Sequence, residues 1–315
     1  MTKYELRSGL FRIPEGTEHT RLHAEAAEAM YQGIVSLARR VLHWQGVVTT
    51  VEGMENIPAY GGALLAMNHT GYYDFLFGSM PAHLRGRRLV RFMAKKEIFD
   101  APVVGRFMRG MKHVPVDRAR GAGAVDAAVE HLNAGHLVGI FPEATISRSF
   151  ELKEFKNGAA RIAAAAEVPL IPMICWGSQR IWTKGLKKNL GRNHLPVHVK
   201  VGAPIELTGD VAADMERLKF AMQALLDQVR ADYDRDHGPF EDGLAWRPAA
   251  NGGVAPTLAE ADRMDAADKA EKARKRKKKA ERKTAKELRK ADDKLAKKAN
   301  RQLRRLSRLG RKEQA

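Results

Sequence analysis

The chain has 315 residues, of which 44% are hydrophobic, and a formal net charge of +18. This size allows one sizeable α/β core with appendages and excludes two large domains. The single cysteine excludes an internal disulfide and fits a reducing compartment. The sequence contains no long apolar run, so we expect no signal peptide and no transmembrane helix.

Residues 1–45 are predicted to form an N-terminal amphipathic helical segment. From Thr20 to Trp44, apolar residues recur at three- and four-residue steps, which is the pattern of an amphipathic helix. The polar side of this helix includes Arg39 and Arg40. Two interpretations stay open, namely a helix packed on its own core and a helix lying at a membrane interface with Arg and Trp at headgroup level.

Residues 46–235 alternate between short apolar runs and helical segments. Such alternation predicts an α/β fold with a mostly parallel sheet flanked by helices. The expected strands are Val47–Val51, Ala63–Met67, Val90–Met93, His113–Val116, Leu137–Phe141, Leu170–Cys175 and Val197–Val201. The expected helices are Tyr72–Leu84, Val103–Met111, Ala124–Ala134, Asn157–Ala166 and Val211–Tyr233.

The last quarter of the chain changes in composition. Residues 236–262 are rich in Gly, Pro and Ala and are interpreted as a linker. Residues 263–315 are a Lys/Arg-rich tail, expected to be an exposed helix or disordered, that carries most of the net positive charge of the chain. An anionic membrane and nucleic acid would both suit this charge, but the tail has no aromatic residue for base stacking. A nucleic-acid partner is therefore the less favoured interpretation.

The segment GGALLAMNHTGYYDFL places a histidine and a carboxylate after an apolar strand. His69 follows the strand Ala63–Met67, and Asp74 falls in the first turn of the next helix. A carboxylate on one ring nitrogen leaves the other nitrogen ready to accept a proton, which is the arrangement of a general base. On spacing alone the alternative stays open that Asp74 caps the helix and His69 is its structural partner.

Two further segments carry polar groups that could bind a phosphate. In LVGIFPEATISRS, a strand ends in Phe141-Pro142 and is followed by Glu143, Thr145 and Arg148. If the strands are parallel, this turn lies at the same sheet edge as His69. Arg118, in VPVDRARG, could offer a fork of donors to phosphate or form a surface ion pair. Glu143 could equally be a helix N-terminal acid or a surface residue.

These segments resemble the boxes of a known family. NHTGYYD is similar to the N-H-x4-D box of the glycerolipid acyltransferases, whose best-known members are the lysophosphatidic acid acyltransferases, and FPEATIS resembles their F-P-E-G-T-R-S box. VPVDR and VPLIPM resemble two further blocks, and all four appear in the family order. This chain departs from the pattern at Ala144 and Ile146, where the family usually has Gly and Arg.

The resemblance implies a glycerol-phosphate acyltransferase-like fold and a role for each matching residue. His69 would be the general base and Asp74 its orienting partner. The residues expected to bind the substrate are Asn68, Arg118, Glu143, Thr145 and Arg148.

The implied activity is transfer of a fatty acyl group from acyl-CoA or acyl carrier protein to 1-acylglycerol 3-phosphate, without a metal or another cofactor. Because the box lacks its Arg, glycerol 3-phosphate, another lysophospholipid or a glycolipid is an alternative acceptor. The expected location is cytoplasmic, peripheral on the inner face of the cell membrane. The basic segment WGSQRIWTKGLKKNLGR would meet anionic headgroups or donor phosphates, unless it is an ordinary solvated loop.

Overall fold

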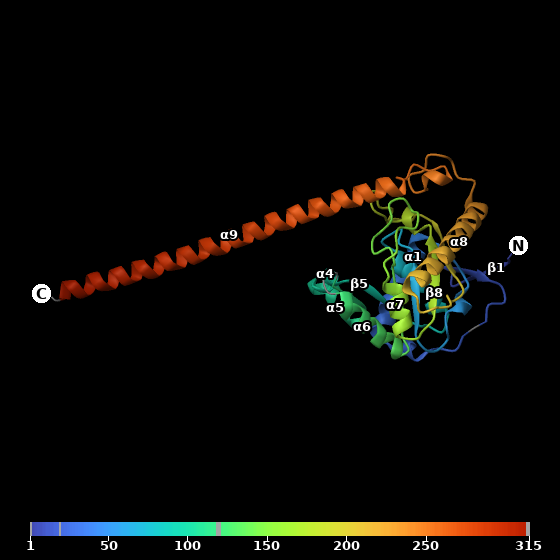
Figure 1. Ribbon diagram of the computed structural model, residues 1–315, viewed down its shortest axis with the longest axis horizontal. Helices are drawn as coiled ribbons and strands as arrows, with labels where there is room; N and C mark the ends of the chain where they lie inside the picture. Colours follow the sequence, from blue (N-terminus) through green and yellow to red (C-terminus); the bar gives the residue numbers. More distant parts are fainter. Residues whose placement is uncertain (1, 19, 118–120, 313–315) are drawn as a thin grey trace. The chain divides into compact units, whose positions relative to one another are not determined.

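The structure, a computed structural model, describes residues 2–18, 20–117 and 121–312 (Figure 1). It consists of two units, Met1–Leu258 and Ala259–Ala315. Arg118, one of the residues expected to bind phosphate, lies outside the described residues.

The first unit contains a mixed sheet. In the part of the chain that the structure describes, nine strands pair in the order β1-β2-β3-β9-β8-β4-β7-β5-β6. Neighbouring strands are parallel except in the pairs β1/β2 and β8/β9, which confirms the mostly parallel sheet. The strands are β1 Tyr4–Arg7, β2 Phe11–Pro14, β3 Val48–Glu52, β4 Ala63–Met67, β5 Val90–Lys95, β6 Val114–Val116, β7 Leu137–Ile140, β8 Leu170–Trp176 and β9 Pro196–Val201.

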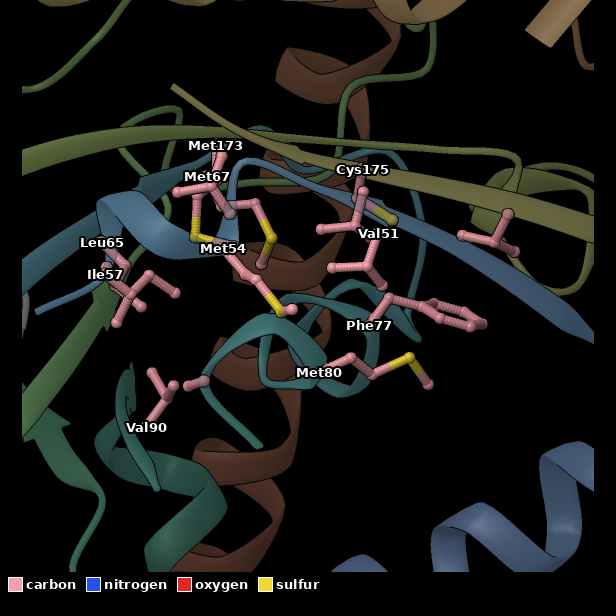
Figure 2. Packing of buried hydrophobic residues seen from close by; sticks show 14 of the residues in the cluster. Val51, Met54, Ile57, Leu65, Met67, Phe77, Met80, Val90, Met173 and Cys175 are labelled. Atoms are coloured by element: carbon pink, nitrogen blue, oxygen red, sulfur yellow. The ribbon is translucent and has the colours of Figure 1, made fainter. Parts of the chain in front are cut away.

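Two central strands, β4 and β8, are buried at every position. Their side chains alternate between two hydrophobic clusters: Leu65 and Met67 belong to one, whereas Leu64 and Ala66 belong to the other. Figure 2 shows part of the first cluster, where Met67 lies next to Met173 of β8 and Leu65 lies next to Ile57. A parallel strand covered on both faces needs apolar residues at every position, which explains the uninterrupted run ALLAM.

Helices cover both faces of the sheet, as predicted. Residues of α1, α2 and α3 join the first cluster, and residues of α6, α7 and α8 join the second. The helices of this unit are α1 Ala29–Gln45, α2 Asp74–Gly78, α3 Met80–Leu84, α4 Lys96–Phe99, α5 Pro102–Gly110, α6 Gly121–Asn133, α7 Gly158–Ala165 and α8 Val211–His237, and the short 3-10 turns are η1 Ala24–Ala27, η2 Met54–Asn56, η3 Ser178–Arg180 and η4 Ala249–Asn251.

The N-terminal segment and one helix differ from the prediction. Residues 4–14 form the antiparallel hairpin β1-β2 at the sheet edge, and α1 begins only at Ala29. The expected helix Tyr72–Leu84 is divided into α2 and α3 at Ser79. The cause of this break is Pro81, because proline has no backbone N–H to continue the ladder of α2.

The second unit consists mainly of the long helix α9, Leu258–Lys312 (Figure 1). Its composition of Ala, Lys, Arg and Glu favours a helix through intrinsic propensity. The helix begins inside the segment expected to be a linker, and its Leu288 and Leu295 are exposed. No helix among residues 2–18, 20–117 and 121–312 is both long enough and apolar enough to cross a bilayer.

Candidate active site

Two strand ends meet at one edge of the sheet. β4 and β7 are adjacent and parallel, with Ala66 opposite Ile140. His69 follows β4 and Phe141 follows β7, so the two turns lie side by side at the carboxyl edge, where α/β folds commonly bind their ligands. The prediction that the two turns share one sheet edge is confirmed.

The imidazole of His69 is hydrogen-bonded to the carboxylate of Asp74. Nδ1 of His69 lies 3.0 Å from Oδ2 of Asp74, which is fully buried. The same oxygen accepts the backbone N–H groups of Thr70 at 2.6 Å and Gly71 at 2.8 Å. With Nδ1 donating its proton to this fixed carboxylate, Nε2 presents a lone pair.

Ser178 is a further partner of the carboxylate, and the sequence motifs did not identify it. Its Oγ donates to Oδ1 of Asp74 and is fully buried. Gly177 turns the chain towards Asp74 with φ 101°, and a side chain at this glycine would lie 2.5 Å from the carbonyl oxygen of Pro196. A Gly-Ser pair directly after a strand next to β4 was the available signal.

The ring of His69 has one face covered and is partly open to solvent. It stacks on Phe141 with the ring centroids 4.2 Å apart, and Phe141 in turn stacks on Phe92. The His69 side chain is 22% exposed. Within the described residues, no protein group is hydrogen-bonded to Nε2, so this nitrogen is available to a substrate hydroxyl.

Glu143 supports the backbone of His69. Its Oε1 accepts the N–H of His69 at 2.8 Å, and its Oε2 accepts the N–H of Lys153 at 3.2 Å. Burial raises the pKa of Glu143 from 4.5 to about 8, against the lowering effect of these two donors. The carbonyl oxygen of His69 accepts the N–H of Ser147 at 2.7 Å. The position predicted for substrate contact is therefore occupied by a buried side chain that joins the two turns.

Asn68 also has its polar atoms occupied by the protein. Its amide nitrogen donates to the carbonyl oxygen of Cys175, and its amide oxygen accepts the Cys175 N–H. The side chain is 1% exposed, so Asn68 extends the pairing between β4 and β8 rather than facing a ligand. Cys175 is buried in β8 as expected, and burial raises the pKa of its thiol, which makes it a poor nucleophile.

A lysine from another loop contacts the stretch of residues 144–148. Nζ of Lys184 donates to Oγ1 of Thr145 at 3.1 Å. Arg148 is close to the same loop, because a side chain at Gly185 would lie 3.0 Å from its Nη1. Ile146, which replaces the family Arg, is buried. Lys184 therefore reaches the loop from which that Arg is missing.

Two clusters of potential metal ligands lie elsewhere in the described part of the chain. One is His198, Asp236 and His237, and the other is Glu25, Glu28 and His136. In the first, both Asp236 oxygens bind Arg groups. In the second, Arg91 pairs with Glu28. Protein cations thus already occupy carboxylates in both clusters, and neither cluster includes His69.

Comparison with known proteins gives consistent matches. The family described as Acyltransferase matches residues 48–176. A 1-acyl-sn-glycerol-3-phosphate acyltransferase of Bacillus subtilis is 30% identical over 211 residues, which are 64% of this chain and 100% of the relative. A chloroplastic 1-acyl-sn-glycerol-3-phosphate acyltransferase of Arabidopsis thaliana is 32% identical over 176 residues, 54% of this chain and 48% of the relative.

A solved structure supports the fold. The crystal structure of the 1-acyl-sn-glycerophosphate acyltransferase PlsC from Thermotoga maritima aligns with a TM-score of 0.52 at 24% identity. The alignment covers 67% of this chain and 85% of that structure. The chain thus spans the whole bacterial relative, most of the solved structure and about half of the plant protein.

Proposed function

The chain belongs to the acyltransferase family, and on that basis we propose that it transfers a fatty acyl group from acyl-CoA or acyl carrier protein to the free hydroxyl of 1-acylglycerol 3-phosphate. The observation that carries the proposal is the hydrogen bond from His69 Nδ1 to the buried Asp74, with the imidazole partly exposed at the sheet edge. The relatives named for this reaction supply the acceptor.

The chemistry requires one proton transfer at His69. Nε2 takes the proton of the acceptor hydroxyl while its oxygen attacks the thioester carbonyl, and Asp74 stabilises the imidazolium that forms. The tetrahedral intermediate then collapses, the carbon–sulfur bond breaks, and the imidazolium returns its proton to the departing thiolate. The products are the acylated lipid and the free thiol, and these steps need no metal or redox cofactor.

We infer that the acceptor phosphate is held beside residues 145–148. Lys184 contacts Thr145, and Arg148 lies near the same loop. Lys184 would supply the charge that Ile146 cannot, although as a compact ammonium rather than a planar fork. Arg118 remains a predicted third contact. Because a single ammonium is less selective than a bidentate Arg, glycerol 3-phosphate, another lysophospholipid or a glycolipid is the alternative acceptor.

An anionic membrane surface is the proposed partner of the enzyme. Leu37, Val41 and Trp44 of α1 follow four- and three-residue steps and are all exposed, which favours the interfacial interpretation of this helix. The side chain of Gln45, at the end of α1, donates to the carbonyl oxygen of Leu190 in the loop after β8. The end of α1 therefore lies at the sheet edge that carries His69. We therefore propose a peripheral location on the inner face of the cell membrane.

The decisive experiment incubates purified protein with labelled acyl-CoA or acyl carrier protein and a panel of acceptors. The panel contains 1-acylglycerol 3-phosphate, glycerol 3-phosphate and other lysolipids. We expect acyl transfer to 1-acylglycerol 3-phosphate that requires His69. Transfer to another acceptor would favour the alternative, and an inactive protein with every pair would contradict the proposal.

The basic tail supplies a separate test against nucleic-acid binding. Its charge would bind any polyanion with a steep dependence on salt. We expect deletion of residues 264–315 to weaken binding to anionic vesicles. If the deletion abolished DNA binding and left vesicle binding unchanged, the nucleic-acid interpretation would be preferred.

A further inference from the structure

Helix α5 presents its apolar side chains to solvent. Val103, Val104 and Phe107 are 68%, 50% and 47% exposed, and they share one face of the helix. Of its nine residues only Gly105 is buried. An exposed group of large apolar side chains commonly marks an interaction site.

Gly105 explains why the apolar face points outwards. A side chain at this position would lie 2.0 Å from the carbonyl oxygen of Phe99, so α5 approaches the backbone of α4 through the glycine. Arg109 fixes the same orientation, because its Nη1 donates to that carbonyl oxygen at 2.6 Å. The outward apolar face is therefore determined by packing, and α4 adds the exposed side chain of Ile98 to it.

The topology places this face at the edge of the sheet that carries the site. α4 follows β5 directly, and β5 is parallel to β7, which is parallel to β4. The start of α5 therefore lies beyond the same carboxyl ends as His69. Figure 1 shows α4 and α5 next to β5. A row of ring contacts leads from His69 through Phe141 and Phe92 to Phe75, which is itself half exposed.

The charges around the apolar face identify its partner. Residues 95–112 carry five Lys/Arg against two Asp/Glu, and α5 has Arg106 and Arg109 but no acid. Apolar residues beside Arg groups match a bilayer with anionic headgroups, where the rings enter the acyl boundary and the cations meet phosphate. A second copy of the chain would instead set one Arg pair against another.

We propose that α5 enters the headgroup region of an anionic bilayer and holds the His69 edge of the sheet against the lipid. This inference rests on the proposed function in one respect: a lipid substrate would have to reach the site from the bilayer. Insertion itself needs no catalysis, so the two can be tested separately.

A fluorescent probe tests the insertion directly. The only natural thiol, Cys175, is buried, so a Val104→Cys variant of the full chain can be labelled selectively with a polarity-sensitive dye. With phosphatidylglycerol vesicles we expect a saturable blue shift. The matched control is Phe220→Cys, an exposed position on α8, where we expect no shift. No shift at position 104, or a shift that depends on protein concentration without vesicles, would overturn the proposal.

A charge variant measures the contribution of the apolar face. In about 1 M salt, where the screening length is about 3 Å and the basic tail contributes little, Phe107→Glu should weaken vesicle partitioning about tenfold. Phe220→Glu, the same chemical change elsewhere, should leave it unchanged. Equal effects of the two variants would overturn the proposal. If the probe inserts but no acyl donor reacts, the proposed function fails and the membrane role of α5 stands.

Discussion

The turn after β4 and the turn after β7 lie side by side, but they use their polar residues differently. In the first, the groups of His69, Thr70 and Gly71 converge on the carboxylate of Asp74. In the second, Glu143 supports the backbone of the first turn and Thr145 meets a cation from a third loop. Under the proposed function, proton transfer and acceptor recognition would depend on separate sets of residues, and we expect substitutions in the two turns to have different kinetic effects.

The largest effect is expected from His69→Ala. Removing the general base should lower kcat by about 10²–10⁴-fold or more. The fold should survive, because the imidazole is partly exposed and its removal leaves no buried charge in contact only with apolar atoms. Measuring both the reaction rate and the thermal unfolding of the variant distinguishes a loss of catalysis from a loss of the fold. Full activity in the variant would contradict the general-base assignment.

Asp74→Asn should leave a small remainder of the activity. The Asn side chain has a single acceptor oxygen, because its other end is an NH2 donor. It therefore cannot accept all the hydrogen bonds that His69, Thr70, Gly71 and Ser178 donate to Asp74. We expect at least about a 10²-fold loss in kcat and a loss of about 1–3 kcal/mol in the free energy of unfolding. A variant with unchanged stability would show that the buried hydrogen bonds contribute less than their geometry indicates.

A smaller and different effect is expected from Lys184→Met. Loss of the ammonium beside Thr145 should raise KM for the phosphorylated acceptor about tenfold while kcat changes little. Lys184→Arg is the matched control and should retain most of the affinity. If kcat fell while KM stayed constant, Lys184 would act in the chemical step rather than in binding.

Glu143→Gln should change the pH dependence of stability. Burial raises the pKa of Glu143 from 4.5 to about 8, so the folded protein keeps a proton that the unfolded chain releases. Its contribution to stability is complete below pH 4.5 and is lost as the pH rises towards about 8. Gln does not titrate, so wild type should lose stability relative to the variant across this window. Urea unfolding at both limits measures the difference, and a constant difference would contradict the assignment.

The smallest effect is expected from Ala144→Gly. Ala144 has φ 56°, in the left-handed region that favours glycine, the residue usual at this place in the family it resembles. Substitution should stabilise the fold by about 1 kcal/mol, which is about 2–4 °C in Tm for a unit of this size. Calorimetry measures this, and destabilisation would mean that the methyl group makes contacts that outweigh the backbone strain.

The central strands could be predicted closely because burial on both faces leaves an uninterrupted apolar run. The predicted limits of β4 agree with the structure, and those of β8 differ only at Trp176. The hairpin β1-β2 was not predicted, because a short edge strand such as Tyr4–Arg7 contains few apolar residues and resembles a loop. The limits of an edge strand depend on its partner, which local pattern does not reveal.

The site was predictable where its partners are close in sequence. His69 and Asp74 are five residues apart, and the structure joins them. Ser178 contributes to the same carboxylate from more than a hundred residues away. The Gly-Ser pair after β8 indicates a turn there, but it does not indicate which carboxylate the serine contacts. Asn68 and Glu143 were recognised as important residues, but only the folded backbone shows that their polar atoms are used inside the protein.

The backbone of His69 is held from both ends of one short stretch, by the Glu143 carboxylate and by the Ser147 N–H. The three residues between these anchors include both departures from the family pattern, Ala144 and Ile146. If these residues meet the acceptor, as proposed, substitutions among them can change which alcohol is accepted while both anchors of the His69 backbone stay in place. A saturation library at positions 144 to 146 would be the natural starting point for redirecting the enzyme to new lipids.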